Sequence, residues 1–198
     1  NPKDSKTWSA VTLPWMSIGY EVRMTPLQIL TFYNAIANNG KMVKPVFIKS
    51  ITQRGKQLQH FGPTVISPKI CSASTVKYAQ GLLEGVVENG TATNLKNPNY
   101  KIAGKTGTAQ IANRENGYKS KSAVTYQASF VGYFPADNPK YTCIVVVNAP
   151  SKLDYYAAVV AGPVFKEIAD KVYSSRLDMH REYFGEPAVN LAQDVKKQ

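Results

Sequence analysis

The sequence is poor in residues that bind metals or form disulfides, since its 198 residues include only two cysteines and two histidines. Cys71 and Cys143 each stand alone in their neighbourhoods, as do His60 and His180, so the spacing of a metal site is absent. The cysteines fall at a predicted helix start and in a predicted strand, which favours two half-buried free thiols over a disulfide. We therefore expect no metal ion and no other cofactor.

Long apolar runs are absent too. No uncharged segment approaches the ~18 residues that a membrane-spanning helix needs, so we expect no membrane segment and no signal peptide in this chain.

Acidic residues are few, with 13 Asp and Glu against 24 Lys and Arg, a formal net charge of +11. This charge favours anionic partners. The basic residues are scattered, however, and no nucleic-acid-binding motif is present, so we expect no nucleic-acid partner.

The hydrophobic content of 43% is that of a globular domain. Residues 1–24 are predicted to be a loop with short extended pieces, punctuated by Pro14 and Gly19. A helix then begins with Thr25 as N-cap, Pro26 at the first helical position and Gln28 completing a capping box.

That first helix should end at Asn39-Gly40, and a second should run over 74–88 and end at Asn89-Gly90. A strand is predicted over 43–52, followed by a polar loop over 53–68. A closing helix is predicted over 155–174, bent or restarted at Pro163.

Three further strands are predicted at residues 101–111, 126–134 and 141–148. The turn composition of 135–140 indicates an antiparallel hairpin between the last two. Residues 142–147 are apolar without alternation, which is typical of a strand covered on both faces. Together these elements predict an α+β fold, an antiparallel sheet flanked by helices, over residues 1–175, followed by a charged tail at 176–198.

The segment Gly104-Lys105-Thr106-Gly107-Thr108-Ala109 has the residues of an anion-binding strand. Alternation on a strand places Thr106 and Thr108 on one face and Lys105 on the other, so two hydroxyls and a cation should occupy opposite rims. The hydroxyls suit a carboxylate, and the lysine adds positive potential. Gly104 and Gly107 allow a ligand or another backbone to come close. The same segment also fits a loosely packed strand without function.

Further blocks in a fixed order surround this segment. They are Ile18-Gly19-Tyr20-Glu21, Met24-Thr25-Pro26-Leu27-Gln28, Ile36-Ala37-Asn38-Asn39-Gly40, Ala103 to Gln110, Ala128 to Pro135, and Gly162-Pro163-Val164-Phe165. With them, residues 15 to 172 resemble the class B penicillin-binding proteins, the peptidoglycan D,D-transpeptidases, and specifically the C-terminal part of the transpeptidase domain. The residues in these blocks are more similar to those of the division (septal) branch than to those of the elongation branch.

The resemblance implies a serine β-lactamase-like fold in which the Lys-Thr-Gly strand lines the active-site cleft. Lys105 is then catalytic, Lys105, Thr106 and Thr108 contact substrate and β-lactams, and Gly107 keeps the edge open. The implied partners are peptidoglycan stem peptides, β-lactams and other cell-division proteins. The implied location is outside the cytoplasm, at the periplasmic face of the inner membrane, with the parent protein anchored in it.

Two motifs of that family are missing from the chain. It contains no Ser-x-Asn, and its one Ser-x-x-Lys, Ser74-Thr75-Val76-Lys77, lies only about thirty residues before Lys105. We interpret Ser74 as a helix N-cap and Lys77 as a solvated side chain. The nucleophilic serine is therefore expected outside this sequence, and the chain alone should not acylate.

Three alternatives remain open at this point. The parent protein could be a β-lactamase or a β-lactam sensor, which share Lys-Thr-Gly on an equivalent strand, or a non-catalytic scaffold of a cell-wall complex.

Asn89-Gly90-Thr91 precedes the Lys-Thr-Gly strand and so could approach the cleft, although a helix-ending turn explains it equally well. We interpret His60 and His180 as surface residues without a chemical role.

Overall fold

A three-stranded antiparallel sheet forms the centre of the computed structural model, which describes residues 8–111, 124–151, 154–176 and 179. Its strands are β5 (Ala103–Gln110), β6 (Tyr126–Phe134) and β7 (Tyr141–Asn148), in the order β5-β6-β7. The three predicted strands and the antiparallel hairpin between the last two are confirmed.

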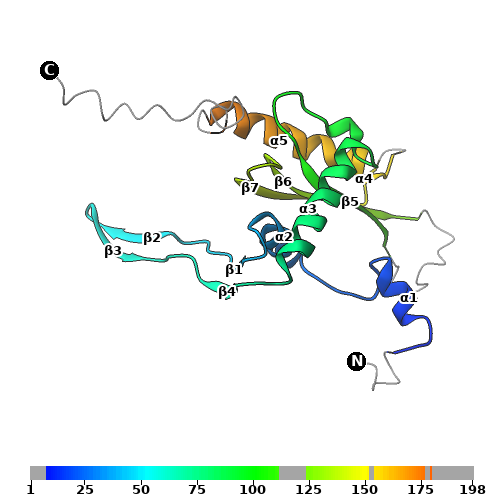
Figure 1. Cartoon of the computed structure of the whole chain (residues 1–198), viewed down its shortest axis with the longest axis horizontal. Coiled ribbons are helices and arrows are strands. Elements are labelled where there is room, and N and C mark those ends of the chain that lie inside the picture. Colours follow the sequence, from blue (N-terminus) through cyan, green and yellow to red (C-terminus); the bar gives the residue numbers. More distant parts are fainter. Residues whose placement is uncertain (1–7, 112–123, 152–153, 177–178, 180–198) are drawn as a thin grey trace.

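Helices cover both faces of this sheet (Figure 1). On one face, Phe165 of α5 (Gly162–Ser175) packs edge-on against Phe130 of β6, with ring centroids 4.8 Å apart. On the other face, Tyr133 of β6 packs with Ala37 of α2 (Pro26–Ala37) and Leu83 of α3 (Ala73–Glu88). The predicted α+β class is confirmed. Because α5 and α2 both contact β7, this strand is covered on both faces, yet it stays half-buried because it is an edge strand.

The first predicted helix has the expected start. The Thr25 hydroxyl accepts from the Gln28 N–H at 3.3 Å, and the Gln28 side chain accepts from the Thr25 N–H at 2.8 Å, a complete capping box. The closing helix restarts beside Pro163, as predicted, with α4 (Ala157–Val160) ending just before α5 begins. A short 3-10 turn, η1 (Thr93–Leu95), lies between α3 and β5.

Two expectations for residues 1–52 were wrong. Residues 12–17 form a short helix, α1 (Thr12–Ser17), because Pro14 lies in the first helical turn, where its missing N–H breaks no hydrogen bond. The strand predicted at 43–52 is divided, since Pro45 follows the short β1 (Met42–Val43) and the chain pairs again only in β2 (Ser50–Gln53).

The loop predicted at 53–68 contains two strands. β3 (Lys56–His60) pairs with β2 as a hairpin, and β4 (Val65–Ser67) pairs with β1, both antiparallel. His60 is exposed on β3, while His180 lies outside the described residues. Of the predicted tail at 176–198 the structure describes only residues 176 and 179, so that domain boundary stays a prediction.

The two cysteines are free and half-buried, as the sequence predicted. Within the described ranges, no helix has the length and apolar character to cross a membrane, and no three His, Cys, Asp or Glu side chains gather as metal ligands would.

A partly buried polar cluster joins α5 to the segment before β5. Asp170 accepts hydrogen bonds from the Tyr100 hydroxyl at 2.6 Å, from the Asn97 amide at 2.7 Å and from the Lys166 ammonium at 2.8 Å. Partial burial acts to raise the pKa of the Asp170 carboxyl, but the hydrogen bonds from Lys166 and Tyr100 outweigh it and hold the pKa below its ordinary value. The tyrosine ring stacks on Tyr173 with centroids 4.4 Å apart.

Close packing between β5 and β6 requires glycine at position 104. A Cβ there would lie 2.6 Å from the Val131 carbonyl oxygen and 2.7 Å from the Phe130 ring. We expect Gly104→Ala to lower the free energy of unfolding by about 2 kcal/mol, because a backbone atom cannot move aside. Gly81→Ala, at an exposed position of α3 where a Cβ meets nothing within 4 Å, is the matched control and should be neutral or stabilising. Urea unfolding of both variants measures the difference, and an equal effect would contradict the packing argument.

The polar cluster predicts an acid dependence of stability. A carboxyl with a lowered folded-state pKa stabilises the fold above its ordinary pKa of 3.8, and this contribution is lost as the pH falls through the folded-state value. Asp170→Asn should therefore cost about 1 kcal/mol at neutral pH, with the cost shrinking below pH 3.8. Denaturant unfolding from pH 7 to pH 3, with the exposed Asp137→Asn as control, tests this. If Asp170→Asn cost the same at every pH, the charge of the Asp170 carboxylate would not contribute to stability.

Candidate substrate-binding site

The Lys-Thr-Gly segment lies on β5, an edge strand that pairs only with β6 among the described residues. In an antiparallel ladder, successive residues point their backbone groups alternately toward the partner and away from it. The Lys105 ammonium donates to the Thr106 carbonyl oxygen at 2.9 Å, which shows that this carbonyl faces the free edge. The N–H of Thr108, two residues further on, shares that orientation and is available to a ligand.

Both threonine hydroxyls have a partner outside β5. Thr106 Oγ1 lies 3.0 Å from Thr91 Oγ1, which comes just after α3. Thr108 Oγ1 accepts from the Ala157 N–H at the start of α4, at 3.2 Å. Because that N–H can only donate, the Thr108 proton stays free to be donated to an anionic ligand. Thr91 thus contacts the Lys-Thr-Gly strand, and the helix-ending turn is present too, with Asn89 as the C-cap of α3.

The predicted separation of the cation from the hydroxyls was wrong. Lys105 leaves β5 on the opposite face from Thr106, yet its ammonium turns round the free edge to 3.5 Å from Thr106 Oγ1. Its long side chain can do this because no described strand lies beyond β5. The ammonium and the Thr106 hydroxyl therefore share one rim, which concentrates positive charge and donors in one place.

Of the two roles expected for the glycines of the segment, close approach of another strand or of a ligand, the structure shows the first. Gly104 accommodates the Phe130 ring and the Val131 carbonyl, and a Cβ at Gly107 would lie 2.7 Å from Ser129 Oγ. Both positions thus hold β6 close, rather than only opening space to a ligand. The role of Gly107 in substrate binding stays a prediction, as do the roles of Lys105, Thr106 and Thr108.

Three tyrosines stack where β5 ends, a feature that the sequence analysis missed. Tyr126 stacks on Tyr155 with centroids 4.0 Å apart, and Tyr155 stacks on Tyr156 with centroids 4.6 Å apart. Tyr126 pairs with Gln110 at the end of β5, and Tyr156 directly precedes the Ala157 N–H. The hydrogen bond between the Tyr155 and Tyr156 hydroxyls raises the pKa of Tyr156 above its ordinary value. The adjacent pair Tyr155-Tyr156 was the available signal.

Ser74 lies far from this site. The N-cap of α3 is Ser72, whose hydroxyl accepts from the Thr75 N–H, so the prediction of Ser74 as N-cap was wrong by two residues. Ser74 is an exposed residue of the first turn, hydrogen-bonded to Ser72 at 2.9 Å. The end of α3 that leads to Thr91 is about 21 Å away at 1.5 Å per residue. Ser74 therefore cannot serve as a nucleophile beside Lys105.

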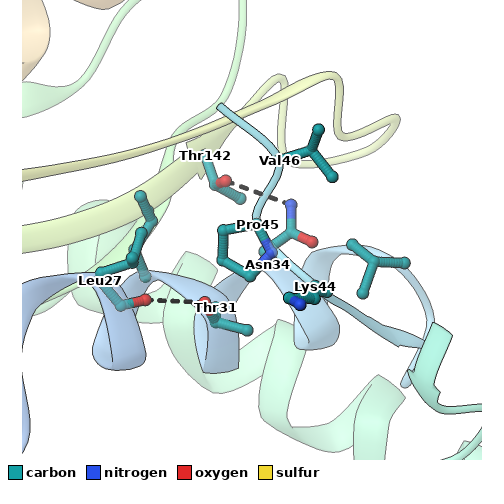
Figure 2. Close-up of a pocket in the computed structure, with 9 residues that line it drawn as sticks. Leu27, Thr31, Asn34, Lys44, Pro45, Val46 and Thr142 are labelled. Carbon is teal, nitrogen blue, oxygen red and sulfur yellow. Dashed lines mark hydrogen bonds between the residues drawn. The ribbon is translucent and has the colours of Figure 1, made fainter. Parts of the chain in front are cut away.

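A separate pocket of about 250 Å³ lies between α2 and residues 43–46, the end of β1 and the segment that follows it (Figure 2). Across its wall, the Asn34 amide donates to Thr142 Oγ1 at 3.3 Å. It is lined by Leu27, Leu30, Thr31, Asn34, Val43, Lys44, Pro45, Val46 and Thr142. No residue of β5 lines it, so it is distinct from the Lys-Thr-Gly edge.

The fold and the site together define a class. An antiparallel sheet covered by helices, with Lys-Thr-Gly on a free edge strand and donors gathered beside it, is the arrangement of the penicillin-recognising serine acyl-transfer enzymes.

Comparison with known proteins identifies the family. Residues 3–170 match the penicillin binding protein transpeptidase domain, and the chain belongs to this family. It is 30% identical to a peptidoglycan D,D-transpeptidase FtsI homolog of Mesostigma viride, over 83% of this chain and 28% of that protein. It is 33% identical to penicillin-binding protein PbpB of Mycobacterium tuberculosis, over 82% of this chain and 25% of that protein.

Solved structures agree with this assignment. Penicillin binding protein 3 of Mycobacterium tuberculosis, in complex with aztreonam, has a TM-score of 0.73 and 31% identity, over 86% of this chain and 39% of that one. The transpeptidase domain of Burkholderia pseudomallei penicillin-binding protein 3 has a TM-score of 0.68 and 31% identity, over 87% of this chain and 49% of that one. The chain thus spans only about a quarter of the length of those two curated relatives.

The contact between Gly107 and Ser129 can be tested by compensation. Gly107→Ala should destabilise the chain by about 1 kcal/mol, because its Cβ must displace Ser129 Oγ. Adding Ser129→Ala removes that oxygen and should restore most of the stability, a favourable coupling of about 0.5–1 kcal/mol between the two sites. Urea unfolding of the two single variants and the double variant gives the coupling. Strict additivity would show that another contact makes glycine necessary at position 107.

Proposed function

We propose that this chain forms the substrate-carboxylate wall of a peptidoglycan D,D-transpeptidase that also binds β-lactams. The observation that carries the proposal is the hydrogen bond from the Ala157 N–H to Thr108 Oγ1, because it leaves the Thr108 proton free for an anionic ligand. Family membership and the named activities of the relatives support it.

The chemistry assigned to each residue follows from its position. The Thr106 and Thr108 hydroxyls donate to the carboxylate of the D-Ala-D-Ala terminus, and Lys105 supplies the positive potential that draws it to the rim. The outward N–H of Thr108 donates to the oxyanion that forms at the attacked carbonyl. Thr91 and Ala157 keep the two hydroxyls in place.

The bond-making serine belongs to a part of the protein outside this sequence, since the chain has no Ser-x-Asn and Ser74 is remote from β5. In the intact enzyme that serine attacks the D-Ala-D-Ala carbonyl and D-Ala leaves with the proton. The amine of a neighbouring stem peptide then takes the acyl group and releases the serine. The chain alone does not acylate.

The same site accounts for β-lactam binding, because a β-lactam also offers a carboxylate and an acylating carbonyl. Solved neighbours of this chain hold aztreonam and ampicillin. We extend the proposal to a role in cell division, with other division proteins as partners, and to a site of action outside the cytoplasm at the periplasmic face of the inner membrane, with the intact protein anchored there. The FtsI name of two relatives supports the division role.

The test is acylation of the intact protein by a fluorescent penicillin. Lys105→Ala should slow acylation by about a hundredfold, because the rim loses its cation where negative charge gathers. The fold should survive, since the Lys105 side chain is exposed and its hydrogen bonds reach only Thr106. Lys101→Ala, an exposed lysine just before β5 that pairs with Glu84, is the matched control and should acylate normally.

Normal acylation of the Lys105 variant would remove the proposed role of the lysine. Ser74→Ala in the same assay should change nothing, and loss of labelling with it would overturn the account of the nucleophile. Rapid turnover of a chromogenic cephalosporin would indicate a β-lactamase instead.

A further inference from the structure

The β2–β3 hairpin projects from the body of the molecule, on the side away from the end of β5 (Figure 1). From Ile51 to His60 every residue is exposed. The tip is a two-residue turn, Arg54-Gly55, in which both residues have positive φ, 48° and 80°. This is the turn that matches the twist of a two-stranded ribbon, so the projection is a formed element. We call residues 44–69, the hairpin with its flanking segments, the basic ribbon.

The charge of this region is of one sign. Between residues 22 and 83 the sequence has eight Lys and Arg and no Asp or Glu, which is most of the net charge of +11. The basic ribbon contributes Lys44, Lys49, Arg54, Lys56 and Lys69, all exposed. Among the residues that the structure describes, none of these five forms an ion pair, whereas Lys96, Lys101, Lys166 and Lys171 elsewhere do.

Apolar side chains lie between these cations. Phe47 is 83% exposed, and Ile48 and Leu58 are each 58% exposed. Unneutralised cations with apolar groups between them suit a partner that has both carboxylates and apolar faces. Cross-linked peptidoglycan has this chemistry, because its stem peptides carry free carboxylates and alanine methyl groups beside the sugar rings.

We propose that the basic ribbon is a second peptidoglycan-binding surface, which contacts carboxylates of stem peptides away from those that react at β5. This inference rests on the proposed function, since that function brings the polymer to the protein. A contact remote from the active site holds the enzyme on the polymer between acyl transfers and raises the local concentration of stem peptides. Its strength falls with added salt, because the charges are exposed.

The variant that tests it removes three charges and keeps the hairpin. Arg54→Asn preserves the turn, since Asn is the preferred partner of Gly at this position, and Lys49→Gln and Lys56→Gln replace exposed side chains. The matched control removes three charges elsewhere, Lys96→Gln, Lys101→Gln and Lys171→Gln, at side chains that are 50%, 56% and 75% exposed.

The experiment is co-sedimentation of the intact protein with purified sacculi, over a range of salt concentrations, beside fluorescent-penicillin labelling of the same samples. The ribbon variant should bind sacculi about tenfold more weakly at low salt, on the scale of three exposed ion pairs, and label with penicillin at the normal rate. The control variant should bind like the wild type. Amidation of the sacculus carboxylates should remove the difference between the ribbon variant and the wild type.

Other outcomes would overturn the inference. Equal loss of binding in both variants would show a general effect of net charge. Unchanged binding in the ribbon variant would show that the cations of the basic ribbon do not contact peptidoglycan. Binding of the wild type to phosphatidylglycerol vesicles but not to sacculi would assign the ribbon to a membrane. Failure of the wild type to label with penicillin would reject the proposed function, whatever the sacculi show, so the two failures are distinguishable.

Discussion

The eight-residue ladder between β5 and β6 is the constraint on which the site depends. It fixes which residues of β5 face inward and which reach the free edge, and two glycines keep it close. Phe130 and the Val131 carbonyl occupy the space that a side chain at Gly104 would need, and Ser129 does the same at Gly107. A one-residue shift in register would turn the Thr106 and Thr108 hydroxyls to the opposite face, away from Thr91 and Ala157.

Local sequence signals predicted the elements that local chemistry determines. The capping box at Thr25, the strands with their 135–140 turn and the restart at Pro163 each depend on residues close in sequence. The β2–β3 hairpin was missed because Arg54-Gly55 lacks the Asn or Asp that usually marks such a turn. Pro14 was taken as a loop residue, although proline is equally suited to a first helical turn.

Sequence reasoning named the residues of the candidate site but not how their side chains meet. Alternation placed Thr106 and Thr108 on one face, which the ladder confirms, because period two is a backbone property. The position of the Lys105 ammonium was wrong because four methylene groups let it pass round an edge strand. The contacts of Thr91 and of the stacked tyrosines join segments distant in sequence, which no local pattern encodes.

The division of hydrogen-bonding roles explains why a site of this kind needs more than its motif. A threonine hydroxyl in isolation has one proton, which it can donate to water, to a neighbouring group or to a ligand. Donation to water or to a neighbour therefore competes with the hydrogen bond to the ligand. The Ala157 N–H donates to Thr108 Oγ1 and so occupies a lone pair of that oxygen. The Thr108 proton then stays available to a ligand at the free edge of β5. The Thr91 hydroxyl, 3.0 Å from Thr106 Oγ1, holds that second hydroxyl in place. The motif supplies the donors, whereas α4 and the segment after α3 orient them, so the proposed carboxylate wall depends on the folded domain as well as on the motif.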